Sequence, residues 1–178
     1  DEPRVHAVVI TGSGRAFCSG GDVRDIISRL VDQSPSEVLT FTRMTGELIA
    51  NMRKLEKPIV AAVDGTAAGA RAVIALAAHL RVFSDESKIA FLFTKVGLAG
   101  AHMGAGYLLP RVVGQGRASE LLLLGDTIDA KTAERYGLAN RVVPPERCVH
   151  TAMDLARRLA KGPLAALATT KRLIGVGG

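Results

Sequence analysis

The stretch that decides the fold is Ile59-Val60-Ala61-Ala62-Val63-Asp64-Gly65-Thr66-Ala67-Ala68-Gly69-Ala70. Its first five residues are apolar and partly β-branched, which is typical of a short strand buried on both faces. Asp64 and Gly65 then indicate a turn. Residues 69–78 are mostly small and are apolar nearly all round, so we expect a buried helix there. The stretch therefore predicts a buried strand followed closely by a buried helix.

The segments on either side repeat this alternation. Before the stretch we expect a strand at residues 5–10, also buried on both faces, and helices at 23–31 and from Ser34 to about Lys57. After it we expect strands at 80–83, 89–93 and 141–143, and helices at 115–124, 129–136, 149–160 and from Pro163 onward. This order predicts an α/β architecture with a mostly parallel sheet. We expect a single domain over residues 1–178, with a core at 1–143 and a helical carboxy-terminal part at 144–178.

The composition indicates a chain with a sizeable core. Of the 178 residues 48% are hydrophobic, which excludes an intrinsically disordered chain. The two cysteines, Cys18 and Cys148, form neither a disulfide framework nor a zinc site, so a reducing compartment is expected. No apolar run approaches the roughly 20 residues that span a bilayer, and no signal peptide opens the chain. We therefore expect a cytoplasmic protein without a membrane partner.

The charge balance bears on the choice of partners. The chain has 23 Lys+Arg against 17 Asp+Glu, a formal net charge of +6, which invites a nucleic-acid hypothesis. The basic residues are scattered, however, and an aromatic content of 4% leaves few side chains on which bases could stack. Nucleic acid is therefore not the expected partner. Small anionic ligands, including phosphates, fit the modest basic excess equally well.

Two glycine-containing loops are the candidate sites. Residues 12–22 contain glycines at four positions, but they match neither a phosphate-binding loop, nor the dinucleotide fingerprint, nor a nucleophile elbow. A tight turn at the end of a strand is the simpler interpretation. Residues 64–70 have the same arrangement, because they follow a strand and open a helix. Backbone N–H groups at two such turns can stabilise a developing negative oxygen, and the helix dipole adds to this effect.

The residues of these loops resemble the two signature segments of the crotonase (enoyl-CoA hydratase/isomerase) family. The first segment is Gly14-Arg15-Ala16-Phe17-Cys18-Ser19-Gly20-Gly21-Asp22, and the second is Lys57-Pro58-Ile59-Val60-Ala61-Ala62-Val63-Asp64-Gly65 with Gly69-Ala70. Further matches follow in the family's order at residues 110–114, 122–126 and 133–143, so the similarity covers nearly the whole chain. It implies a spiral of ββα units with a helical carboxy-terminal region, and assembly as trimers or hexamers.

The resemblance also implies a substrate and a site. Family members bind acyl-CoA thioesters and polarise the thioester carbonyl with two backbone N–H groups, which would here be those of Gly21 and Ala70. No tightly bound cofactor is implied, because coenzyme A is part of the substrate. Arg15 and Arg24 would lie near its phosphates, and an ordinary surface charge is the alternative for each. The remaining residues that the match places at the substrate are Ala16, Cys18, Gly20, Asp22, Gly69 and Arg71.

The sequence departs from the family at both glutamates that a hydratase uses to activate water. An ungapped placement puts Val73 and Thr94 at these positions, with Lys95 adjacent to the second. Neither valine nor threonine can exchange protons as a glutamate does. The exact reaction is therefore open, for hydration and for double-bond isomerisation alike.

His102 is the remaining candidate for acid–base catalysis. It lies in Ala99-Gly100-Ala101-His102-Met103-Gly104, near the position of a functional Asp in relatives such as the 4-chlorobenzoyl-CoA dehalogenases. Imidazole exchanges protons near neutral pH without a large pKa shift. A lone histidine with no identified partner favours the alternative, a helix-capping or partly exposed side chain. His6 and His79 are expected to be structural.

Arg71 stands where the family usually has glycine or another small residue. Its guanidinium would bind a carboxylate or another anion on the acyl group, or it would crowd the thioester. The helix dipole disfavours a cation in the first turn. The placement therefore suggests either a compensating partner, such as Asp64 or Glu86, or an altered site.

Three hypotheses of function follow from this sequence. The first is an enzyme of the enoyl-CoA hydratase/isomerase type that stabilises a thioester enolate in a backbone oxyanion hole. The second is a catalytically weak acyl-CoA-binding or scaffold protein of the same fold, and RNA binding is a third and weaker hypothesis. The chain is also shorter than the usual family unit, so we expect it to lack initial strands and part of the carboxy-terminal helices.

Overall fold

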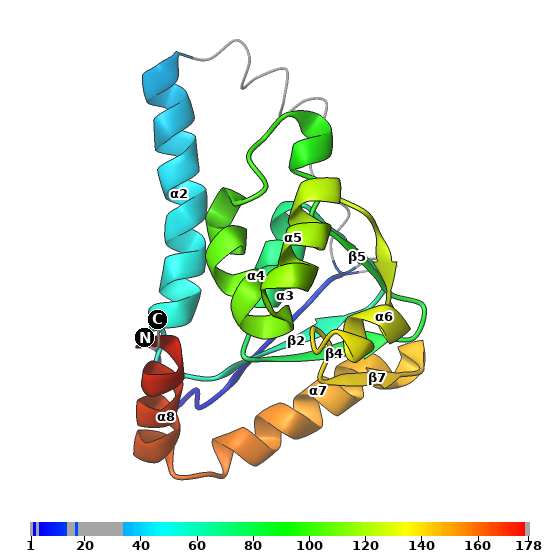
Figure 1. Ribbon diagram of the computed structural model, residues 1–178. Helices are drawn as coiled ribbons and strands as arrows, with labels where there is room; N and C mark the ends of the chain where they lie inside the picture. Colours follow the sequence, from blue (N-terminus) through cyan, green and yellow to red (C-terminus); the bar gives the residue numbers. More distant parts are fainter. Residues whose placement is uncertain (1, 3, 14–16, 18–33, 177–178) are drawn as a thin grey trace.

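The computed structural model describes residues 2, 4–13, 17 and 34–176 (Figure 1). Its larger sheet is parallel throughout, with the strand order β1 (Val8–Thr11), β2 (Ile59–Val63), β4 (Leu80–Ser84) and β7 (Arg141–Val143). The smaller sheet contains β3 (Thr66–Ala68), β5 (Lys88–Ala90) and β6 (Ile128–Asp129). In it β3 and β5 are parallel, whereas β5 and β6 are antiparallel. The expected mostly parallel α/β architecture is confirmed.

Helices make up most of the rest of the described chain. They are α2 (Pro35–Lys54), α3 (Ala70–Ala77), α4 (Ala105–Val113), α5 (Gln115–Leu124), α6 (Ala130–Arg135), α7 (Pro145–Ala160) and α8 (Leu164–Val176). The 3₁₀ turns η1 (Thr94–Val96) and η2 (His102–Gly104) precede α4. A capping box starts α2, because the side chains of Ser34 and Glu37 each accept a hydrogen bond from the other's backbone N–H. Among the helices described, none is long and apolar enough to cross a bilayer.

The strand β2 lies inside the larger sheet, and both of its faces are buried. One face packs toward α3 and α4 through Ile59, Ala61 and Val63, and the other packs on α7 through Val60 and Ala62. Figure 1 shows α7 along one side of the sheet and α3, α4 and α5 on the other. Because successive side chains of a strand point to opposite faces, an all-apolar strand suits this three-layer arrangement.

Some expected strands differ from those observed. The strand expected at residues 5–10 begins only at Val8, and it is half-buried instead of buried on both faces, because β1 is the edge strand of its sheet. The strand expected at 89–93 ends at Ala90, after which the chain turns into η1. The short strand β3 lies in a segment expected to be a loop. The helix expected at 23–31 lies outside the described residues.

Arg81 joins the end of α3 to the segment before β7. Its side chain is buried and donates hydrogen bonds to the carbonyls of Leu76, Ala78 and Leu138. Leu76 and Ala78 lie at the carboxyl end of α3, where helix carbonyls lack partners within the helix. The guanidinium supplies these partners and offsets the negative end of the helix dipole. Arg81 therefore fixes the far end of the helix that begins at Ala70.

His79 connects the starts of two neighbouring strands. Its Nδ1 accepts a hydrogen bond from the Ile59 N–H at 3.0 Å, which confirms the expected structural role. Burial lowers the pKa of His79 to about 3, and the nearby cations Lys171 and Arg53 act in the same direction. The imidazole is therefore neutral in the folded protein at pH 7, as a hydrogen-bond acceptor must be.

This neutral histidine predicts a pH-dependent stability. The ordinary pKa of 6.5 in the unfolded chain lies above the folded value of about 3, so unfolding takes up a proton between these values. The stability from His79 is complete above pH 6.5 and decreases toward pH 3, with a slope of at most about 1.4 kcal/mol per pH unit. Urea unfolding should show this slope flattened in His79→Gln, which keeps an acceptor for Ile59. An identical slope in both proteins would contradict the assignment.

Candidate active site

The turn before α3 is fixed by the smaller sheet. Ala68 of β3 pairs with Ala90 of β5, and the Gly69 N–H donates to the Ala90 carbonyl at 2.9 Å. The Gly69 carbonyl in turn accepts a hydrogen bond from the Val73 N–H at 3.3 Å, which closes the first turn of α3. Ala70, the first residue of the helix, is thus held between a strand pairing and a helical turn.

Ala70 presents its backbone N–H at the amino-terminal end of α3. The residue is exposed, and within the described ranges no group accepts a hydrogen bond from this N–H. The first N–H groups of a helix have no partner in the helix, and the helix dipole places partial positive charge there. Such an N–H can stabilise a ligand oxygen that becomes negative during a reaction.

Gly69 is required by its backbone conformation. Its φ of 59° and ψ of −127° lie in a region that only glycine adopts without strain. A Cβ at this position would meet nothing within 4 Å, so space is not the constraint. The conformation turns the chain from the pairing with β5 into the axis of α3.

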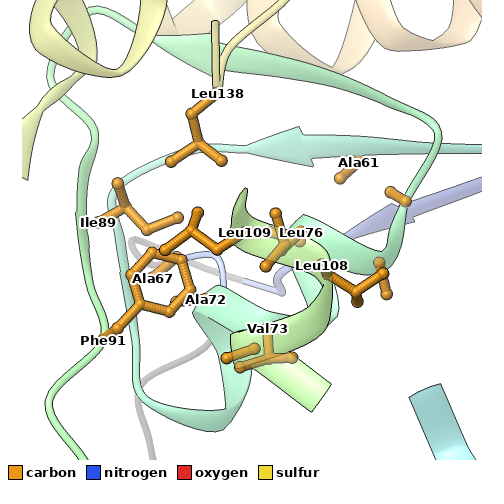
Figure 2. Packing of buried hydrophobic residues seen from close by; sticks show 14 of the residues in the cluster. Ala61, Ala67, Ala72, Val73, Leu76, Ile89, Phe91, Leu108, Leu109 and Leu138 are labelled. Atoms are coloured by element: carbon orange, nitrogen blue, oxygen red, sulfur yellow. The ribbon is translucent and has the colours of Figure 1, made fainter. Parts of the chain in front are cut away.

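The two glutamate positions of the resemblance hold side chains with other roles. Val73 is completely buried among the aliphatic side chains that α3 shares with α4 (Figure 2). Thr94 donates from its hydroxyl to the Leu122 carbonyl at 3.3 Å. The ammonium of Lys95 forms an exposed ion pair with Asp126 at 2.8 Å. Neither Val73 nor Thr94 supplies an acid or a base, and Lys95 is neutralised by a carboxylate.

His102 begins η2, the 3₁₀ turn that packs against α2, α3 and α4. Its imidazole is half-buried, and the ring centre lies 5.4 Å from that of the buried Phe93. Burial lowers the pKa of His102 below its ordinary value, so the ring is neutral at pH 7 and carries a lone pair that can accept a proton. In the part of the chain that the structure describes, this side chain caps no helix, and Gly104 is the N-cap of α4.

The residue after His102 has an unusual backbone conformation. Met103 has a φ of 54° and a ψ of 23°, in the left-handed region that residues other than glycine seldom occupy. Its side chain is buried in the main core cluster, so packing holds the strained conformation in place. This kink gives the turn that carries His102 a defined shape, which no pattern in the sequence indicates.

Part of the predicted site lies within the described residues. Gly69, Ala70 and Arg71 follow one another at the start of α3, and the turn of His102 packs against the same helix. The other predicted site residues lie outside the described residues: Arg15, Ala16, Cys18, Gly20, Gly21, Asp22 and Arg24. The described half of the predicted oxyanion hole is therefore the amide of Ala70.

Arg71 is half-buried in the first turn of α3. Asp64 and Glu86 were its expected partners, but the ion pairs among described residues do not join either of them to Arg71. Among the described residues, no group of three or more His, Cys, Asp or Glu side chains could hold a metal ion.

The chain resembles known proteins over almost all of its length. A family model described as enoyl-CoA hydratase/isomerase matches residues 1–175. The 1,2-epoxyphenylacetyl-CoA isomerase of Escherichia coli K12 is 36% identical over 170 residues, which are 96% of this chain and 64% of that protein. Mycobacterium tuberculosis EchA12, named a probable enoyl-CoA hydratase, is 34% identical over 176 residues, which are 97% of this chain and 62% of that protein. The chain thus spans less than two thirds of these curated relatives.

Solved structures share the fold. A crystal structure from Streptomyces coelicolor A3(2), of a protein described as a candidate enoyl-CoA hydratase, is 51% identical with a TM-score of 0.91. That match covers 95% of this chain and 62% of the other. An enoyl-CoA hydratase from Bacillus anthracis is 27% identical with a TM-score of 0.89, over 99% of this chain and 67% of the other. The fold expected from the sequence resemblance is confirmed.

The conformation of Gly69 predicts a stability effect with a matched control. Gly69→Ala should lower the free energy of unfolding by about 1–3 kcal/mol, because alanine must adopt the strained backbone conformation. Gly116→Ala, at the second position of α5, has open space and no such strain, and should be neutral or stabilising by up to about 1 kcal/mol. Urea denaturation measures both. Equal stability of the two variants would show that the turn tolerates a side chain.

Proposed function

Because the chain belongs to the enoyl-CoA hydratase/isomerase family, we propose that it transforms an acyl-CoA thioester through an enolate held by the backbone amides of Ala70 and Gly21. The observation that carries this proposal is the exposed Ala70 N–H at the start of α3, which lacks an acceptor among the described residues. Coenzyme A is part of the substrate in this proposal and not a resident cofactor. Trimeric or hexameric assembly is proposed with it.

The electrostatics of the turn suit an enolate. Removing the proton on the carbon next to the thioester moves an electron pair onto the carbonyl oxygen, which becomes negative. An N–H at a helix start stabilises this charge more than it stabilises the neutral carbonyl, and that difference is what lowers the barrier. The pairing of β3 with β5 holds the Ala70 amide before substrate arrives, so little reorganisation is required.

His102 is the proposed proton acceptor. The positions of the family's glutamates hold a buried valine and a threonine that is bonded to a backbone carbonyl. The imidazole of His102 is neutral at pH 7, so it can take the proton and return it to the substrate at another carbon or to water. This proposal favours proton-transfer chemistry next to the thioester over hydration by a carboxylate pair.

A second candidate function rests on the same two positions. A protein that keeps the fold but has Val73 and Thr94 in place of two acids can bind acyl-CoA without turning it over. The observation that favours it is the complete burial of Val73, which places an aliphatic side chain within the core at that point of α3. Stabilisation of the protein by acyl-CoA thioesters without any product in a mass-spectrometric panel would support this candidate.

His102→Gln tests the enzyme directly. The variant should lose at least about 100-fold in kcat on any acyl-CoA that the parent converts, while the Kd for that thioester stays nearly the same. In the parent, kcat/KM should rise with pH through the lowered pKa of His102 and level off near pH 7, and this acidic limb should disappear in the variant. His150→Gln, on the exposed face of α7 beside Asp154, is the control and should match the parent. Unchanged turnover in His102→Gln would remove His102 from the mechanism.

Arg71→Gly tests whether the guanidinium serves the substrate. If Arg71 binds an anionic group on the acyl chain, as we propose, the variant should raise KM about tenfold for an acidic acyl-CoA, with a smaller effect on kcat. Lysine at the same position should restore part of the affinity. A large gain of turnover in Arg71→Gly would show instead that the side chain crowds the thioester.

A further inference from the structure

A groove runs between α2, α4 and α8. Its volume is about 710 Å³, in the range of small-molecule sites. Ile49 and Leu55 of the α2 segment, together with Met103 and Leu108, form its apolar part. Figure 1 shows the carboxyl end of α2 beside α8. The α4 and α8 walls are joined by a hydrogen bond, from the Tyr107 hydroxyl to a carbonyl of α8 at 3.5 Å.

The same groove has a strongly basic lining. Its cations are Arg53, Lys54, Lys171 and Arg172, and Glu56 is its carboxylate. None of these cations forms an ion pair within the described part of the chain. The ammonium of Lys171 donates to a backbone carbonyl, that of Lys57, at 3.3 Å. This bond positions the charge without neutralising it.

Two titratable groups reflect the excess of positive charge. The pKa of Lys171 is lowered to about 8, first by burial and then by Arg53, although Glu56 acts in the opposite direction. The pKa of His79, which does not line the groove, is lowered to about 3, first by burial and then by Lys171 and Arg53. An anion between Arg53 and Lys171 would relieve their mutual repulsion.

We propose that this groove binds an aliphatic carboxylate, with its chain along Ile49, Leu55 and Leu108 and its carboxylate between Arg53 and Lys171. The apolar and the basic parts of the groove together select this ligand. Inorganic phosphate would satisfy the cations but leave the apolar residues in water, and an uncharged chain would leave the cations unpaired. The helical part of the α2 side of the groove extends from Gly46 to Lys54, about 12 Å along the helix axis, which accommodates an extended chain.

Titration calorimetry of the 178-residue chain with dodecanoate, below its micellar concentration, tests the proposal. One site is expected, with about tenfold weaker binding in Arg53→Gln and in Lys171→Gln, because each loses a charge-assisted contact. Arg158→Gln removes the same charge from an exposed position on α7 outside the groove, and should bind as the parent does. Dodecanol and inorganic phosphate should each bind at least about tenfold more weakly than dodecanoate.

Several results would overturn the proposal. They are the absence of dodecanoate binding, equal binding of dodecanol, and unchanged binding in both charge variants. The chain could instead self-associate through this groove. Self-association that Arg53→Gln weakens and dodecanoate leaves unchanged would show that a second copy occupies the groove. Arg172 is exposed, so Arg172→Gln should fold as the parent does. This variant keeps the test valid if the half-buried positions Arg53 and Lys171 do not tolerate change. Because no acyl-CoA is used, the outcome is independent of the proposed enzyme activity.

Discussion

The hydrogen bond from the Gly69 N–H to the Ala90 carbonyl is the interaction on which the site depends. With the pairing of β3 and β5 it ties the loop after β2 to a strand that follows α3 in sequence. The helix between them is anchored by burial on one side, through side chains such as Val73 and Leu76, and by Arg81 at its far end. Its first amide is therefore placed by the rigid part of the fold while remaining exposed to a ligand.

This arrangement separates stability from chemistry within one short helix. Val73 is the residue of α3 at which the resemblance places a glutamate. Its side chain points into the core, so it contributes packing and no proton transfer. The proposed chemistry uses the backbone amide of Ala70 and the imidazole of His102, on a turn that packs against the same helix. A backbone amide depends little on side-chain identity, so the proposed oxyanion hole does not require the acids and bases of a hydratase.

The sequence predicts the elements whose signal is local. The strand β2 and the helix α3 are predictable from the sequence, because every residue of the strand is apolar and the residues of the helix are mostly small and apolar. The strand β3 is not predictable from the sequence, because its three small residues show no periodicity and their pairing partner lies beyond a helix. The same holds for β1, whose edge position depends on which strands lie beside it and not on its own apolar residues.

The candidate sites differ in the same way. The glycine at residue 69 indicates a turn in the sequence, because glycine is the residue that most readily adopts a positive φ. The left-handed conformation of Met103 is not indicated by its residue type. The basic groove is hidden from the sequence, since its walls come from residues 46–56, 103–108 and 168–175, which only the fold brings together. Scattered cations that look like a solvated surface in the sequence thus form one lining.

The central claim is that the Ala70 amide binds a thioester carbonyl. NMR titration of a chain labelled with ¹⁵N-alanine, using acetyl-CoA and then free coenzyme A, tests this contact. Of these two ligands, only acetyl-CoA has a thioester carbonyl. The account predicts a downfield shift of the Ala70 amide proton with acetyl-CoA and none with coenzyme A. An Ala70 resonance that responds equally to both, or to neither, would contradict it.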